Sequence, residues 1–152
     1  MNKIEEWIYA LKVCKKYGLK FKPSFEKGYG QYDFIEGSVS VDVLNKDFMT
    51  IFLHEVGHHV HDKSVDYKNF LYKQRLTVNF RHDGRDVISC MEAESFASRF
   101  ARKTKKANVQ FLLKAFNTYT AVYLSPNAEL CRHNLYESVV HKVYKSIRRI
   151  EK

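Results

Sequence analysis

The segment from residue 48 to residue 60 constrains the fold most, because it combines a strongly apolar run with four ionisable side chains. Its apolar residues have the spacing of a helix that is buried on most sides, and within it the chain reads His54-Glu55-Val56-Gly57-His58. Unpaired polar groups are costly inside a protein. The chain therefore needs a fold that buries this helix and still supplies partners for its polar side chains.

The two histidines have the spacing of a metal site. Four residues advance an α-helix by about 400°, so His54 and His58 project from one face and can bind one ion at about 2.0 to 2.1 Å. Glu55 is rotated by about 100° and is expected beside the ion, where it can take a proton from water and pass it to a leaving amine. The alternative is a helix with two core histidines that are satisfied by hydrogen bonds.

A catalytic zinc ion usually has three protein ligands, so a third ligand is expected outside this motif. The metzincin pattern continues with a glycine and a third histidine, and the corresponding positions here hold His61 and Ser64. His61 shares the face of the motif histidines, but seven residues span about 10.5 Å of helix. We therefore expect His61 at the rim of the site.

Two carboxylates follow in the next expected helix, in the segment Glu92-Ala93-Glu94-Ser95-Phe96-Ala97. Together with the motif, this segment resembles the ImmA/IrrE family of metallo-endopeptidases, over roughly residues 30 to 101. The resemblance implies a zincin-like fold, one zinc ion and Glu92 as the third ligand, with Glu94 where the family usually has Asp or Asn. It also implies a regulatory protease of a phage or mobile element, which cleaves a protein substrate such as a transcriptional repressor.

Periodicity alone leaves the third ligand open, because Glu92 and Glu94 both lie at the margins of the apolar stripe of this helix. Ser89 to Glu92 is also a capping-box pattern, in which Glu92 would bond the helix N-terminus, and Cys90 is a further candidate ligand. The interpretation adopted is a zinc-dependent endopeptidase with His54, His58 and Glu92 as metal ligands and Glu55 as the catalytic residue.

Two further points of chemistry stay open in the sequence. Such sites usually add a donor that stabilises the oxyanion, and the candidates are Tyr119, Tyr123, His133 and His141. Deformylases also use H-E-x-x-H with an upstream ligand cysteine. Cys14 is at a comparable distance, but its Val-Cys-Lys context on the first expected helix argues against that class.

Length and composition predict one α+β domain over residues 1–152. The chain has 45% apolar residues, only two prolines and six glycines, which suits a single globular core. We expect a small antiparallel sheet packed on a helical bundle. The expected strands cover residues 19–23, 29–34 and 38–43, and the expected helices cover 2–17, 45–62, a segment from about 86, 109–124 and 127–150; residues 63–85 are left unassigned.

The first expected helix is amphipathic. Its apolar residues share one stripe at helical spacing, and Gly18 follows where a C-terminal cap belongs. The stripe consists of Ile4, Trp7, Ile8, Leu11 and Cys14.

The net charge of +9 lies in two segments. Residues 99–106 carry +5 and residues 142–152 carry +4, which accounts for the whole excess. Basic clusters at helix ends can face a phosphate backbone, so the alternative function is a non-catalytic regulator on a zincin scaffold that binds nucleic acid or a protein partner.

The three cysteines are odd in number and widely spaced, which suits a reducing compartment, and no apolar run resembles a signal peptide or a membrane span. We expect a cytoplasmic protein with no membrane partner. The oligomeric state is left open.

Overall fold

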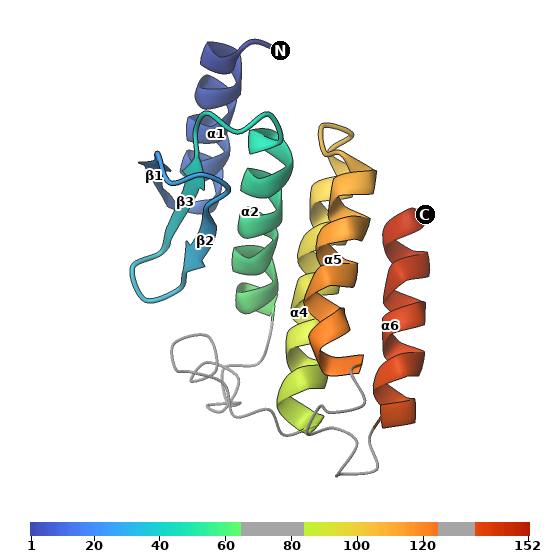
Figure 1. Ribbon diagram of the computed structural model, residues 1–152. Coiled ribbons are helices and arrows are strands. Elements are labelled where there is room, and N and C mark those ends of the chain that lie inside the picture. The colour runs from blue at the N-terminus through green and yellow to red at the C-terminus, as the bar shows by residue number, and fades with distance from the viewer. Residues whose placement is uncertain (65–83, 125–135) are drawn as a thin grey trace.

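The computed structural model describes residues 1–64, 84–124 and 136–152, and within them the fold is α+β as expected. Five helices and a three-stranded sheet are described (Figure 1). The helices are α1 (Lys3–Tyr17), α2 (Phe48–Ser64), α4 (Gly84–Lys103), α5 (Val109–Leu124) and α6 (Tyr136–Glu151). None of the described helices is long and apolar enough to cross a membrane.

The sheet contains β1 (Lys20–Ser24), β2 (Gly30–Asp33) and β3 (Ser38–Asp42) in the order β1-β3-β2. β2 and β3 form the expected antiparallel hairpin, which turns at Gly37 with φ +68°. β1 runs parallel to β3. The sheet is therefore mixed, and the expectation of a purely antiparallel sheet is wrong.

The order of the strands follows from their side chains. Val39 and Val41 of β3 are fully buried, so β3 occupies the centre of the sheet. Pro23 of β1 has no N–H to donate to a neighbouring strand. This suits an edge strand, which is paired on one side only. Because β3 inserts between β1 and β2, these two consecutive strands are not neighbours, and β1 instead pairs with β3 in parallel.

Helix α1 has the expected C-terminus, but it does not bury the expected stripe. Gly18 adopts the left-handed conformation with φ +69°, and its N–H bonds the last turn of the helix. Of the stripe, Cys14 is buried, whereas the four residues before it are exposed. The buried face of α1 is instead built from Ala10 and Cys14, with Tyr9, Val13 and Tyr17 partly buried beside them.

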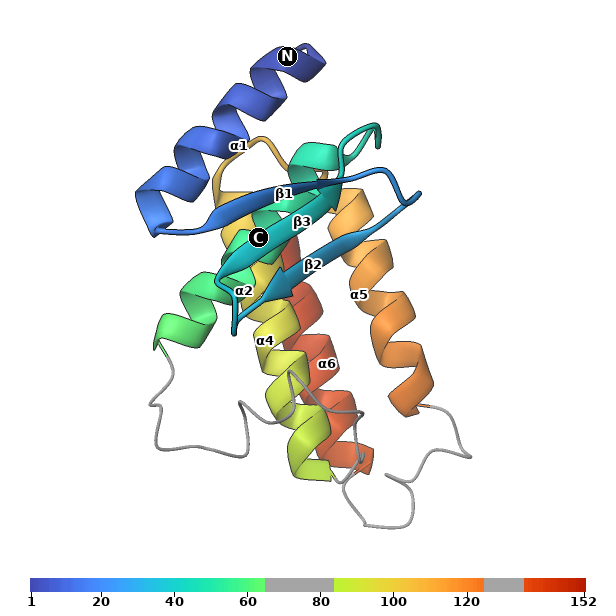
Figure 2. The same cartoon turned by 90° about the vertical axis from the view of Figure 1, so that its left-hand side faces the viewer.

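Helix α2 lies at the centre of the molecule, between the sheet on one side and α4, α5 and α6 on the other (Figures 1 and 2). Its apolar residues contact both layers, and Phe48, Phe52 and Val56 are fully buried. The helix begins at Phe48 and not directly after Asn45, the expected N-cap, because Asn45 forms a turn in which its side chain accepts the N–H of Asp47 at 2.7 Å. The motif helix is thus buried as predicted.

The remaining helices agree with their expected ranges where the structure describes them. The bounds of α5 match the prediction, and α4 begins near the expected residue 86. Most of the unassigned segment 63–85 and the expected first residues of the last helix lie outside the described residues. In Figure 1, α4 and α6 run in the same direction, so their C-terminal ends lie at the same end of the helical layer.

Candidate metal centre

Three side chains from α2 and α4 converge on one point. Nε2 of His54 lies 3.1 Å from Nε2 of His58, and the two carboxylate oxygens of Glu94 lie 2.9 Å and 3.2 Å from these two nitrogens. Among the described residues, these three form the group of His, Cys, Asp and Glu side chains that could hold a metal ion. The two motif histidines therefore face one another and one carboxylate, as the spacing predicted.

The separations fit a tetrahedral ion. Ligand atoms about 2.1 Å from a tetrahedral metal lie about 3.4 Å apart, and the observed contacts of 2.9 to 3.2 Å need to open only slightly. Two imidazole nitrogens and a carboxylate are also a donor set that zinc takes in catalytic sites. The residues present thus fit such an ion.

The third member of the cluster is Glu94, and Glu92, the ligand predicted from the sequence, is not part of it. Glu92 is two residues away and thus points to another side of α4. Its side chain is 56% exposed, and its carboxylate accepts a bond of 2.7 Å from Nζ of Lys142 on α6. Glu94 instead lies on the side of α4 that faces α2.

Gly57 allows α4 to come close enough for this contact. A Cβ atom at Gly57 would lie 2.7 Å from Cα of Ala97 and 2.8 Å from its carbonyl oxygen, so any side chain there would force the helices apart. Ala97 and Ala101 of α4 are fully buried against this crossing. Glu94 is one turn before Ala97, so the close approach brings its carboxylate to the histidines.

Glu55 lies beside the cluster and not in it. It lines a cavity of about 210 Å³ together with His54, Glu94 and Ser98. The glycines 28 and 30 line the same cavity from the sheet, and a Cβ atom at Gly30 would lie 2.4 Å from Cγ2 of Ile51 and 3.5 Å from Oε1 of Glu55. The motif carboxylate is therefore open to a space that both β2 and α5 border.

Ser98 holds the second nitrogen of His54. Its buried hydroxyl lies 3.2 Å from Nδ1 of His54, on the same face of α4 as Glu94 one turn earlier. A partner on Nδ1 fixes the ring so that Nε2 points into the cluster. The sequence analysis missed Ser98, although its i, i+4 spacing from Glu94 was a usable signal.

The cluster binds a proton strongly when no ion neutralises the carboxylate. Burial alone would lower the pKa of His58, but attraction to Glu94 and a hydrogen bond to it raise the pKa to about 9. Burial likewise would raise the pKa of Glu94, but the two imidazoles hold it far below its ordinary value. An ionised carboxylate and an imidazolium are thus the stable pair, as expected of a site built for positive charge.

The other candidates from the sequence lie elsewhere or outside the described side chains. His61 packs its ring on Phe96, with ring centroids 5.0 Å apart, and is not one of the three clustered groups. Cys14 is buried in the core, and burial raises the pKa of its thiol to about 11, which does not suit a metal ligand. Neither Tyr119 nor His141 lines the cavity of Glu55. The side chains of Cys90, Tyr123 and His133 fall outside the described ones.

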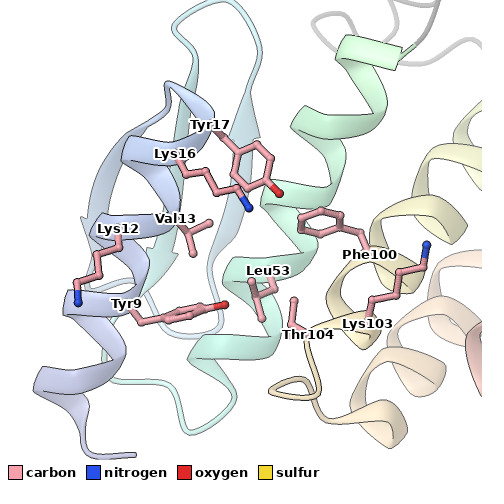
Figure 3. Close-up of a pocket in the computed structure, with 9 residues that line it drawn as sticks. All are labelled: Tyr9, Lys12, Val13, Lys16, Tyr17, Leu53, Phe100, Lys103 and Thr104. Atoms are coloured by element: carbon pink, nitrogen blue, oxygen red, sulfur yellow. The ribbon is translucent and has the colours of Figure 1, made fainter.

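A larger cavity of about 420 Å³ lies where α1 meets α2 and α4 (Figure 3). Its walls are mainly apolar and aromatic, with lysines around them. They include Tyr9, Val13, Tyr17, Leu53 and Phe100. The residues that line it include no histidine, cysteine or carboxylate, so the chemistry of the described residues belongs to the smaller cavity.

Comparisons with known protein families, with curated proteins and with solved structures find no match to this chain.

Proposed function

We propose that the protein is a zinc-dependent endopeptidase that hydrolyses peptide bonds in a protein substrate. The observation that carries the proposal is the convergence of His54, His58 and Glu94 on one point, with Glu55 next to them in a shared cavity. The resemblance to the ImmA/IrrE family points to the same class and to transcriptional regulators as substrates.

The residues of the site would have two roles, metal binding and proton transfer. His54, His58 and Glu94 would hold the ion, and Ser98 would keep His54 in the required orientation. A bound zinc ion would polarise the substrate carbonyl and lower the pKa of water toward 7. Glu55 would take the proton of the attacking water and return it to the leaving amine.

The cavity suggests how a peptide would lie. Gly30 of β2 lines the cavity, so an extended peptide could lie along this strand and pass the carboxylate of Glu55. The opposite wall is apolar and belongs largely to α5, through Phe111, Leu112, Ala115 and Phe116. A wall of this kind favours an apolar side chain next to the cleaved bond.

Cleavage and metal content test the proposal together. The purified chain, loaded with one equivalent of zinc, is assayed on a mixture of quenched fluorescent peptides that differ at one position. We expect cleavage next to apolar residues, and we expect Glu55→Gln to keep the zinc while losing at least about a hundredfold in rate, as is typical for loss of a general base. Full activity in Glu55→Gln would exclude this mechanism.

A second candidate function, binding of a polyanion such as nucleic acid, is favoured by the proximity of the two basic segments. Arg99 of α4 and Arg149 of α6 are close enough that burial and the charge of Arg149 lower the pKa of Arg99. Because α4 and α6 pack together and run in the same direction, segments 99–106 and 142–152 lie at the same end of the helical layer. Juxtaposed cations cost free energy unless a polyanion neutralises them.

Salt titration separates this function from catalysis. We expect a labelled DNA duplex to bind with a linear log-log dependence on salt, and Arg148→Gln with Arg149→Gln to reduce the slope by about 2. The variant Glu55→Gln serves as the control, since it should leave DNA binding unchanged. Absent or salt-insensitive binding would remove this second function.

A further inference from the structure

The outer face of α1 carries a row of large apolar side chains that no described element covers. They occur at i, i+3, i+4 and i+7 and thus form one face about two turns long. Their exposed fractions are 70% for Ile4, 38% for Trp7, 48% for Ile8 and 56% for Leu11. This row is the stripe that the sequence predicts as the amphipathic face of the helix.

Single exposed apolar residues need no explanation, but a continuous row marks an interaction surface. Other exposed apolar residues of the chain, such as Ile35 in the turn between β2 and β3, stand apart from the row in the sequence. The opposite side of α1 already packs on the core through Ala10 and Cys14. The row is therefore a second apolar face on a helix whose first face is satisfied.

We propose that α1 pairs in antiparallel orientation with α1 of a second copy of this chain, about a two-fold axis. The row is self-complementary about its midpoint between Trp7 and Ile8. A two-fold axis there places Ile4 opposite Leu11 of the second copy and Trp7 opposite Ile8 of the second copy. Each large side chain then gains an apolar partner.

The charges beside the row select this orientation. Glu5 and Lys12 are exposed and lie on the same flank of the row, about 20° apart around the helix. In the antiparallel pair, Glu5 lies within about 3 Å, measured along the axis, of Lys12 of the second copy, and the contact is made twice. In a parallel pair this flank of the two copies would lie on opposite sides of the seam, so neither Glu5–Lys12 contact would form.

The expected strength is modest. One helix face buries less than the roughly 800 Å² per partner of a standard interface, so we expect dissociation in the micromolar range. The proposal is independent of the proposed peptidase activity, because Glu55 and the three clustered residues lie on α2 and α4.

Sedimentation velocity of the full chain, from about 2 to about 200 µM, tests the pairing. We expect a monomer–dimer equilibrium, and Ile8→Asp should raise the dissociation constant at least tenfold because a charge would enter the apolar contact. Ile35→Asp is the matched control, since it makes the same change at an exposed isoleucine outside the row and should leave the equilibrium unchanged. Circular dichroism shows that the variants stay folded.

Charge exchange tests the orientation. Glu5→Lys and Lys12→Glu should each weaken the dimer several-fold, and the double variant should recover it. If Glu5→Lys weakened the dimer only because it removes the capping box that Glu5 forms with Asn2, the double variant would not recover it. A monomer at all concentrations, or a dimer that Ile8→Asp leaves intact, would overturn the proposal. Binding of the monomer to phosphatidylserine vesicles that Ile8→Asp abolishes would also overturn it and assign the row to a lipid surface.

Discussion

Gly57 of α2 lies against the backbone of Ala97 of α4, so closely that a methyl group on Gly57 would stand 2.7 Å from Cα of Ala97. The contact sets the distance between the helix that carries two of the clustered groups and the helix that carries the third. Glu94 reaches the histidines because the two backbones meet here. The second variable position of the motif is thus part of the site, although its glycine has no ligand atom.

Gly57→Ala should therefore damage the metal centre more than the helix itself. Overpacking of this kind costs about 1 to 3 kcal/mol, and the separation of α4 moves Glu94 away from His54 and His58. We expect a lower free energy of unfolding by urea denaturation and loss of most bound zinc by atomic absorption. Ala97→Gly in the same chain should not rescue the zinc, because the contact is with backbone atoms; a full rescue would contradict this account.

Glu94→Gln and Glu92→Gln form a matched pair that tests the third ligand. Glu94→Gln removes the charge that lies 2.9 Å from His54, so we expect it to lose zinc. Glu92→Gln removes only an exposed contact with Lys142, so it should keep the full zinc content and almost unchanged stability. The zinc content of both variants after dialysis shows which glutamate is the third ligand. Loss of zinc from Glu92→Gln alone would assign that role to Glu92.

The local features of the sequence predict much of this structure. The left-handed cap at Gly18, the bounds of α5 and the facing histidines all depend on residues within a few positions of one another. Such patterns are visible along one element. Helix ends and helix faces can therefore be predicted directly from them.

The failures concern packing between elements. Glu92 and Glu94 lie on the same helix, and only the position of α2 against Ala97 decides which one meets the histidines. The parallel pairing of β1 depends on β3 entering between two strands that are consecutive in the chain. The apolar row of α1 looks like a core face in the sequence because a face that awaits a partner has the same pattern.

Zinc affinity should rise with pH between about pH 6 and pH 8. His58 has a pKa raised to about 9 by Glu94, so below that pH the ion must displace a proton to bind. We expect the apparent dissociation constant to fall by about tenfold for each pH unit, with about one proton released per ion. Competition with a chromophoric chelator in buffers of different ionisation enthalpy measures both, and a flat profile would show that His58 is not protonated in the metal-free protein.

The stability of the metal-free protein should have the opposite dependence on pH in the alkaline range. The pKa of His58 is raised from 6.5 to about 9, so its contribution is complete below pH 6.5 and is lost as pH rises through about 9. The pKa of Glu94 is lowered from 4.5, so its contribution is present above pH 4.5 and is lost in more acid solution. In urea denaturation with a chelator present, the combined contribution of His58 and Glu94 to the free energy of unfolding should therefore be largest between pH 4.5 and 6.5. In Glu94→Gln the decline toward pH 9 should be much smaller, and an equal decline would assign it to other groups.

Ser98→Ala should weaken zinc binding without removing a ligand. The hydroxyl of Ser98 lies 3.2 Å from Nδ1 of His54, and loss of a partner at this position of a metal site typically costs about 10- to 100-fold in affinity. Ser95→Ala is the matched control, because Ser95 is also buried on α4 but its hydroxyl has no hydrogen-bond partner among the described residues, so its removal should leave both affinity and stability almost unchanged. Competitive zinc titration of the two variants compares them directly. Equal affinities would mean that packing alone holds the ring of His54, whereas a selective loss in Ser98→Ala would place this hydroxyl among the groups that orient the centre.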